Sequence, residues 1–332
     1  MLVIRPGSMP TAEITPYKPT CRYRFCGFAS LSSATSLCFT FDIVGPPLQN
    51  ELYSIYEGRR YNRIIMTGKC ALCGTNASLI DSHFMPASLY QELLDPNGPI
   101  KQMIVLKKDK THQSSEQFSM PLLCQPCEVR FQQGGENWTL GSRYRSDGSF
   151  PLRDMLLRAT PIETKPENSR VYAARQVPGI DVEQLIYFAA SLFWRAGVAD
   201  WKVKFAEAPK IDLDASLMMA LQQYLLGMSP FPSRASIFVS VDDMAAPWRA
   251  MWSPMKRNGR PQLRYSLYIP GIIMELGVDL HPALRIPSIS DIAEVIVLSD
   301  VVYKYVASIG SALAEGSELS KSLARHFPSG RS

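Results

Sequence analysis

The sequence predicts an α+β protein, in which a zinc-stapled module is followed by a domain built from helices and an antiparallel sheet. The first observation behind this prediction is a set of two Cys-x-x-Cys pairs, Cys70/Cys73 and Cys124/Cys127, which bracket one region. The second is an apolar helical pattern over 182–196, followed by short apolar segments separated by turn residues, as is typical of strands.

The composition is that of an ordinary globular protein, and a chain of 332 residues predicts two domains. A net charge of +5 permits nucleic acid as a partner without requiring it. The sequence contains no apolar run of about 18 residues and no N-terminal signal-peptide pattern, so we expect no membrane partner. Seven cysteines, an odd number, argue against a secreted disulfide framework, and we therefore expect a cytoplasmic protein.

Residues 1–65 show little helical or strand periodicity, apart from one candidate strand over 39–44. We therefore expect a poorly ordered N-terminal extension over this range. An alternative is that the natural protein begins at Met66, which lies four residues before Cys70 of the first cysteine pair.

The two cysteine pairs carry the strongest chemical signal. Two intervening residues let both sulfurs of a pair face one point, and four thiolates match the tetrahedral preference of zinc, at about 2.3 Å per Zn–S bond. In a cytosolic protein such pairs are more often metal ligands than disulfides. The stretch between Cys73 and Cys124 is far longer than the roughly 15–20 residues of a compact zinc ribbon, so it must hold an insertion. Thiols packed as small apolar groups, or one redox-active pair, are the alternatives.

Inside the bracketed region, short apolar segments alternate with polar and proline-containing stretches. Proline favours the first turn of a helix, and a glycine pair disfavours helix continuation. The expected elements are a strand over 77–80, a helix from Pro86 capped by Ser82, a strand over 102–106, an exposed loop over 107–119, a strand over 120–123, and a helix from Cys127 that fades at Gly134-Gly135.

This order of elements resembles the treble-clef form of the HNH-endonuclease superfamily over residues 68–140. His83, three residues before Pro86, is similar to the histidine of the family's Asp-His-x-x-Pro motif, and Leu123-Cys124-x-x-Cys127 is similar to its second knuckle. More narrowly, the chain is similar to a group of uncharacterised bacterial HNH-like proteins, in which a helix also ends in Trp-Arg, here Trp194-Arg195. The resemblance implies a zinc-stapled ββα unit whose histidine acts as a general base in the metal-dependent cleavage of DNA.

Two positions depart from the family pattern. Ser82 stands where the family has an aspartate ligand, and Glu128 stands where it has histidine or asparagine. A catalytic Mg²⁺ or Mn²⁺ prefers carboxylate oxygens, so Glu128 is a legitimate substitute. Asp81 should point to the opposite face of an extended strand. Glu136 and Asn137 would assist only if the helix continues past the glycine pair.

The candidate base and the basic residues near it each have a simpler alternative interpretation. An unperturbed histidine has a pKa of about 6.5 and can take a proton from water at neutral pH, but His83 could also be a helix cap or a satisfied internal histidine. Arg130, Arg143 and Arg145 are candidate nucleic-acid contacts, because arginine binds phosphate with two parallel hydrogen bonds. The alternative is that they belong to a solvated helix face and a solvated connector over 142–169.

The second domain is expected over 170–326 and carries no recognisable catalytic motif. Asp181 and Gln184 predict a capped helix over 182–196. Arg195 near its end is interpreted as a complement to the helix dipole, in preference to a buried charge that serves a site. The remaining expectations are strands over 171–175, 235–241, 248–252, 263–269, 271–278 and 293–298, a hairpin turn at Asn258-Gly259, a helix over 215–226 between Asp214 and Gly227, a helix over 301–313, and Met218, Met219 and Met228 as core filler.

The sequence thus predicts a zinc-binding module over 66–141, with Cys70, Cys73, Cys124 and Cys127 as ligands of a structural Zn²⁺. The leading function is a metal-dependent endonuclease that acts on DNA. The alternative is a non-catalytic, zinc-stabilised module that binds nucleic acid or protein. An enzyme whose active site lies in 170–326 is a third possibility without a supporting motif.

Overall fold

The structure is a computed structural model that describes residues 2–4, 66–94, 103–107, 110–165, 169–203, 206–208, 210–257, 263–280, 287–291 and 294–300. Contacts divide the chain into two compact units, of which Pro10–Ile64 lies outside the described residues. Every described residue belongs to the other unit, Met1–Met9 with Ile65–Ser332. The candidate strand over 39–44, the turn at Asn258-Gly259 and the helix over 301–313 also lie outside the described residues.

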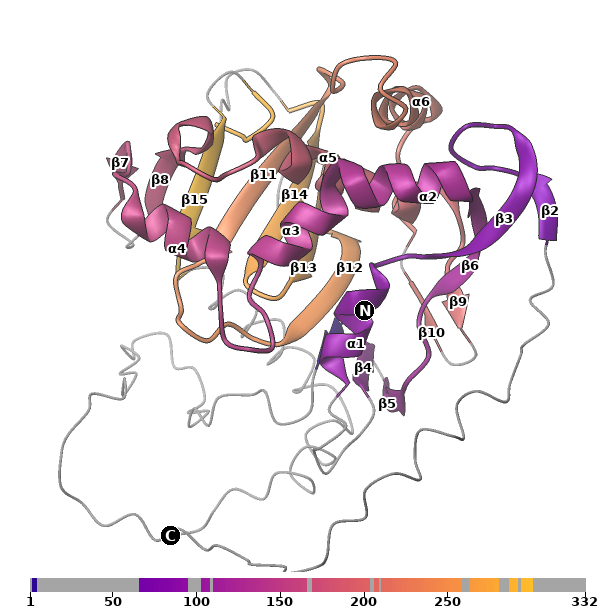
Figure 1. The fold of residues 1–332 in the computed structure, drawn as a ribbon, viewed down its shortest axis with the longest axis horizontal. Coiled ribbons are helices and arrows are strands. Elements are labelled where there is room, and N and C mark those ends of the chain that lie inside the picture. The colour runs from indigo at the N-terminus through magenta and orange to yellow at the C-terminus, as the bar shows by residue number, and fades with distance from the viewer. Residues whose placement is uncertain are drawn as a thin grey trace, which may run out of the picture. The chain divides into compact units, whose positions relative to one another are not determined.

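The described strands form one large mixed sheet and two small sheets (Figure 1). The ten-stranded sheet has the order β5-β4-β1-β12-β13-β14-β11-β15-β8-β7; β2-β3-β6 form a second sheet and β10-β9 a third. The strands are β1 Leu2–Ile4, β2 Met66–Lys69, β3 Asn76–His83, β4 Met103–Lys107, β5 Lys110–Ser114, β6 Ser119–Cys124, β7 Glu163–Thr164, β8 Arg170–Ala173, β9 Lys202–Val203, β10 Ala206–Glu207, β11 Ala235–Asp242, β12 Ala250–Lys256, β13 Leu263–Ile269, β14 Ile272–Val278 and β15 Val295–Ser299.

The central apolar helix α5 packs on strands β11, β12 and β14 of the large sheet and is flanked by η1, α3 and α6 (Figure 1). Leu185, Phe188 and Leu192 of α5 are fully buried, in agreement with the predicted apolar pattern. The helical elements are α1 Ala87–Leu93, α2 Gln125–Phe131, the π-helical turn η1 Gln132–Glu136, α3 Asn137–Ser142, α4 Pro151–Arg158, the 3₁₀ turn η2 Ala174–Gln176, α5 Val182–Val198 and α6 Ala215–Leu225.

The predicted α+β class is confirmed, and both helix caps in the second half are present. Asp181 accepts a hydrogen bond from the backbone N–H of Gln184 at 3.0 Å, and Asp214 accepts one from Leu217 at 3.0 Å. Strand β13 has the predicted bounds. All described strand pairs are antiparallel except β11 with β15, which run parallel. No helix among the described residues is both long and apolar enough to cross a bilayer.

Several local expectations are wrong because tertiary contacts decide them. The predicted loop over 107–119 contains strand β5, which pairs with β4. Ser82 does not cap α1, whose N-cap is Pro86 without a side-chain hydrogen bond. Met219 and Met228 are exposed by 57% and 73%, so they are not core filler, whereas the partly buried Met218 packs against the core.

The glycine pair does not end the helix that begins after the second knuckle. The chain continues from α2 through the π-helical turn η1 into α3 without a break. A Cβ atom on Gly135 would lie 2.6 Å from the carbonyl oxygen of Gln184 and 2.7 Å from the amide nitrogen of Phe188. A Cβ on Gly134 would meet the ring of Tyr187 at 2.6 Å. The glycines therefore permit α5 to approach this helix closely.

Segments from all four predicted regions pair in the large sheet, and β7 comes from the predicted connector over 142–169. Leu2 of β1, which falls in the predicted N-terminal extension, lies opposite Leu106 of β4 and Trp252 of β12. Strands β4 and β5 come from the range 66–141 of the predicted zinc module, and β12 comes from 170–326. The described parts of these two ranges therefore share one sheet, while the predicted domain boundaries at 66–141, 142–169 and 170–326 stay predictions.

Candidate metal centre and the charged site beside it

The first cysteine pair lies in the hairpin turn between β2 and β3. The amide of Cys70 donates to the carbonyl of Thr75 and that of Gly74 to the carbonyl of Cys70, both at 2.9 Å. Gly74 closes the turn with a φ of 74°, a left-handed conformation that favours glycine. Gln222 of α6 donates to the carbonyl oxygens of Ala71 and Leu72, at 3.4 and 2.5 Å, and so fastens the turn to the second half of the chain.

The second pair lies where β6 passes into α2. Cys124 is the last residue of β6 and the N-cap of α2, and Pro126 occupies the first turn of the helix. Register places Cys124 opposite Leu79 of β3, so the strand that follows the first pair runs beside the strand that delivers the second. This antiparallel pairing brings together two pairs that are far apart in the sequence.

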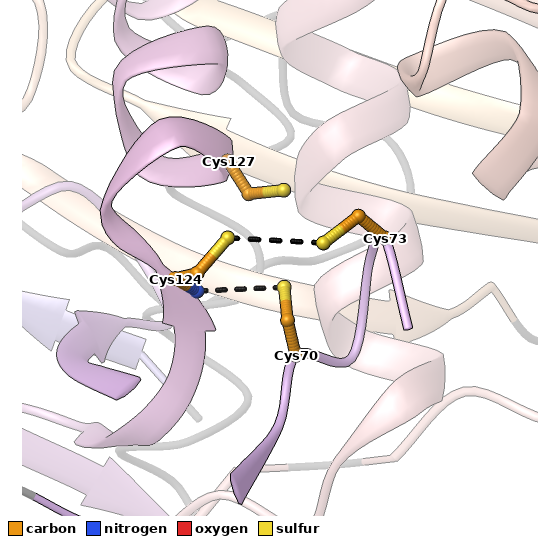
Figure 2. A group of neighbouring side chains, drawn as sticks. All are labelled: Cys70, Cys73, Cys124 and Cys127. Atoms are coloured by element: carbon orange, nitrogen blue, oxygen red, sulfur yellow. Dashed lines mark hydrogen bonds between the residues drawn. The ribbon is translucent and has the colours of Figure 1, made fainter. Parts of the chain in front are cut away.

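The four cysteine sulfurs converge on one point (Figure 2). All lie within 4.8 Å of one another, and the Cys73 and Cys124 sulfurs are 3.8 Å apart. A tetrahedron with Zn–S bonds of about 2.3 Å has sulfur–sulfur edges of about 3.8 Å. The amide of Cys124 donates to the sulfur of Cys70 at 3.4 Å, a contact that stabilises a thiolate ligand. The cluster could therefore hold a metal ion such as zinc.

The thiols differ in their surroundings. Cys70, Cys124 and Cys127 are buried, whereas Cys73 is exposed. Hydrogen bonds from the side chain and backbone of Thr75 lower the pKa of Cys73 to about 6. Burial raises the pKa of Cys124 and of Cys127. A divalent cation among four sulfurs would supply the charge that compensates buried thiolates.

A group of charged and polar side chains lies next to the cysteine cluster. Ser82 is fully buried near the end of β3, and its hydroxyl donates to Oε2 of Glu128, the residue after Cys127, at 3.1 Å. The same hydroxyl accepts the amide of Leu123 at 3.3 Å. His83 follows Ser82 and is partly exposed. Burial raises the pKa of Glu128; Arg195 opposes this shift, Glu136 adds to it, and the Ser82 hydrogen bond and the charge of His83 oppose it.

The preferred interpretation of Arg195 of α5, as a complement to the helix dipole, is wrong. The Arg195 side chain is 1% exposed, so it does not complement the helix dipole from the surface. Nη2 lies 2.8 Å from Oε1 of Glu136 and 4.0 Å from Oε1 of Glu128. The shorter contact is an ion pair rather than an aligned hydrogen bond. The guanidinium also lies over the ring of Phe131, 4.7 Å from its centroid.

The π-helical turn explains how Glu136 reaches Arg195. Eight residues of a regular α-helix would rotate Glu136 by about 80° from Glu128 around the helix axis. A π turn absorbs about one residue, which reduces the offset to about 20°. Both carboxylates therefore face α5. Because the helix continues past the glycine pair, Glu136 lies beside Arg195, whereas its neighbour Asn137 is exposed.

The other predicted site residues lie apart from this group. Asp81 is exposed and accepts the hydroxyl of Ser119 at 3.0 Å, as expected for the opposite face of the strand. Arg143 is 3% exposed and pairs with Glu92 at 2.6 Å, so its guanidinium is buried in the protein rather than presented at the surface. Arg130 is exposed on α2 and donates to the carbonyl of Leu226 at 3.2 Å. Arg145 is partly exposed beside Asp147.

No protein-family model matches the chain, and comparisons with curated proteins and with solved structures found no match. The resemblance to the HNH-endonuclease superfamily therefore rests on the motifs quoted above. The sequence did not predict that Gln222 holds the turn of the first cysteine pair, nor that Arg195 pairs with Glu136. The one available signal was the presence of an arginine near the end of a mostly apolar helix.

Proposed function

We propose that the cysteine cluster holds a structural Zn²⁺ in a treble-clef unit and that the adjoining site hydrolyses phosphodiester bonds in DNA. The observation that supports this is the position of His83. It is partly exposed at the end of β3 and directly follows Ser82, whose hydroxyl donates to Glu128. An accessible base close to a carboxylate is an arrangement that general-base hydrolysis can use.

In this proposal His83 takes the proton from the attacking water, and the water oxygen forms a bond to phosphorus. The bond from phosphorus to the departing sugar oxygen breaks, and that oxygen takes a proton from solvent. The imidazolium that forms is stabilised by the negative charge of Glu128, which Ser82 holds in place through its hydroxyl. Zinc would keep the β2–β3 turn and the start of α2 together, and so would keep His83 near Glu128. Arg130, which is exposed on the same helix as Glu128, and the partly exposed Arg145 are the remaining candidate contacts for backbone phosphates.

A catalytic Mg²⁺ or Mn²⁺ does not fit at Glu128. One carboxylate oxygen accepts the Ser82 hydroxyl, and the other faces the guanidinium of Arg195 at 4.0 Å, which would repel a divalent cation. Within the described residues, the four cysteines are the one group of three or more potential ligands that lie close together. No step of the proposed reaction therefore runs through such an ion.

Replacing His83 with alanine should abolish cleavage and leave the metal site intact. We expect the rate of plasmid nicking to fall by about 100-fold or more, the usual effect of removing a general base. Zinc content and the circular dichroism spectrum should be unchanged. The matched control is His112→Ala, at a position in β5, which should cut like the wild type. Equal cutting by His83→Ala and the wild type would refute the mechanism.

The second candidate is a non-catalytic module that binds nucleic acid or protein. The observation in its favour is that Glu128 is already engaged by Ser82 and Arg195. This function predicts that a labelled DNA duplex binds equally well to the wild type and to His83→Ala, and that neither cleaves it. Fluorescence anisotropy, with a gel of the same samples, separates the two functions. DNA cleavage that disappears in His83→Ala would exclude this second candidate.

A further inference from the structure

We propose that Arg195 is a positioning residue, whose guanidinium is held by Glu136 and fixes the carboxylate of Glu128 beside His83. This inference rests on the proposed function, because it assigns a role in the same site. It adds helix α5 to strand β3 and helix α2, which carry His83 and Glu128, and α5 lies outside residues 68–140, the range of the treble-clef resemblance.

The first argument is the cost of the buried charge. Arg195 is 1% exposed in the apolar helix α5, and among the described residues its Nε and Nη1 atoms have no hydrogen-bond partner. An apolar side chain of similar size at such a position is often neutral or stabilising. The stability of the core therefore does not explain why arginine stands here.

The second argument is that two unusual backbone features converge on this contact. The π-helical turn brings Glu136 onto the face that carries Glu128, and π turns are rare features that frequently occur at functional sites. Gly134 and Gly135 lie within the same turn and allow α5 to come close enough for Arg195 to reach both carboxylates.

The third argument is the way in which the end of α5 is held. The indole nitrogen of Trp201 donates to the carbonyl of Arg195 at 2.8 Å, and the Trp201 ring stacks on Phe84, with centroids 5.2 Å apart. Phe84 directly follows His83. The backbone of Arg195 is therefore linked to the strand end that carries the proposed base, while its side chain is linked to Glu128.

A paired neutral substitution separates positioning from simple stabilisation. Arg195→Met with Glu136→Gln removes both charges, so no buried charge is left unpaired. The matched control is Arg143→Met with Glu92→Gln, which removes the ion pair of another buried arginine with a partly exposed glutamate. None of the described hydrogen bonds or ion pairs of Arg143 and Glu92 involves His83 or Glu128. For each protein the measurements are thermal unfolding, kcat, KM and the NMR signals of the His83 imidazole. These signals are assigned by comparison with His83→Gln.

We expect kcat of the Arg195/Glu136 double variant to fall roughly 100-fold with little change in KM, because a small displacement of catalytic groups has this effect. The His83 imidazole signals should move as well. The Arg143/Glu92 variant should lose similar stability yet keep kcat and these signals. A folded Arg195/Glu136 variant with wild-type kcat and unmoved His83 signals would overturn the inference.

Two further outcomes remain decisive. If the double variant does not fold, Arg195→Lys replaces it, since lysine keeps the charge but lacks the planar fork that can face two carboxylates. We then expect a partial loss of kcat and moved His83 signals; wild-type values would overturn the inference. If the wild type cleaves no DNA, the proposed function fails, and the NMR signals alone decide the role of Arg195.

Discussion

Cys127→Ser is expected to remove zinc from the protein and to destabilise the whole β2–β3–β6 and α2 region. Cys127 is buried in the four-sulfur cluster, and a hydroxyl is a much weaker zinc ligand than a thiolate. Zinc binding contributes about 10 kcal/mol or more to folding in small zinc domains, which is comparable with the total stability of many proteins. Here the apolar core should retain the rest of the fold, so we expect a large fall in melting temperature rather than complete unfolding.

The measurement is zinc per chain by elemental analysis, together with calorimetric unfolding with and without a strong chelator. The matched control replaces Cys21, Cys26 and Cys38, the cysteines outside the two pairs, with serine. That variant should keep the zinc content and melting temperature of the wild type. Zinc retained by Cys127→Ser, or a wild type that contains no zinc and is indifferent to the chelator, would contradict the assignment of the cluster.

Gly135→Ala is expected to lower the free energy of unfolding by about 3 kcal/mol, at the upper end of the usual overpacking cost. The new methyl group would lie 2.6 and 2.7 Å from backbone atoms of Gln184 and Phe188. Backbone atoms cannot move aside as a flexible side chain can, so α5 would have to shift away from η1. That shift would also separate Arg195 from Glu136.

The matched control for this substitution is Gly141→Ala in α3. A Cβ atom there would meet nothing within 4 Å, and alanine favours helix by up to about 1 kcal/mol over glycine. Denaturant unfolding should therefore show Gly141→Ala as stable as the wild type or slightly more stable. Equal denaturant midpoints for Gly135→Ala and Gly141→Ala would contradict the inference that the glycine pair is needed for the close approach of α5 to η1.

Much of the local structure was readable from the sequence, because local chemistry decides it. The Cys-x-x-Cys spacing predicted two turns with convergent sulfurs, and Asp181 predicted the start of α5. The alternation of residues along an extended strand predicted that Asp81 would face away from Glu128. In each case the deciding contact lies within a few residues or follows from the geometry of one element.

The sequence by itself determined the four clustered cysteines, the apolar helix α5 and most strands of the large sheet. Only the tertiary structure decided that the glycine pair continues the helix, that Arg143 is buried against Glu92, and that Arg195 faces two carboxylates. The physical reason is that the environment of a charged side chain depends on which elements pack around it. Segments distant in the sequence supply those neighbours, and no local pattern encodes them.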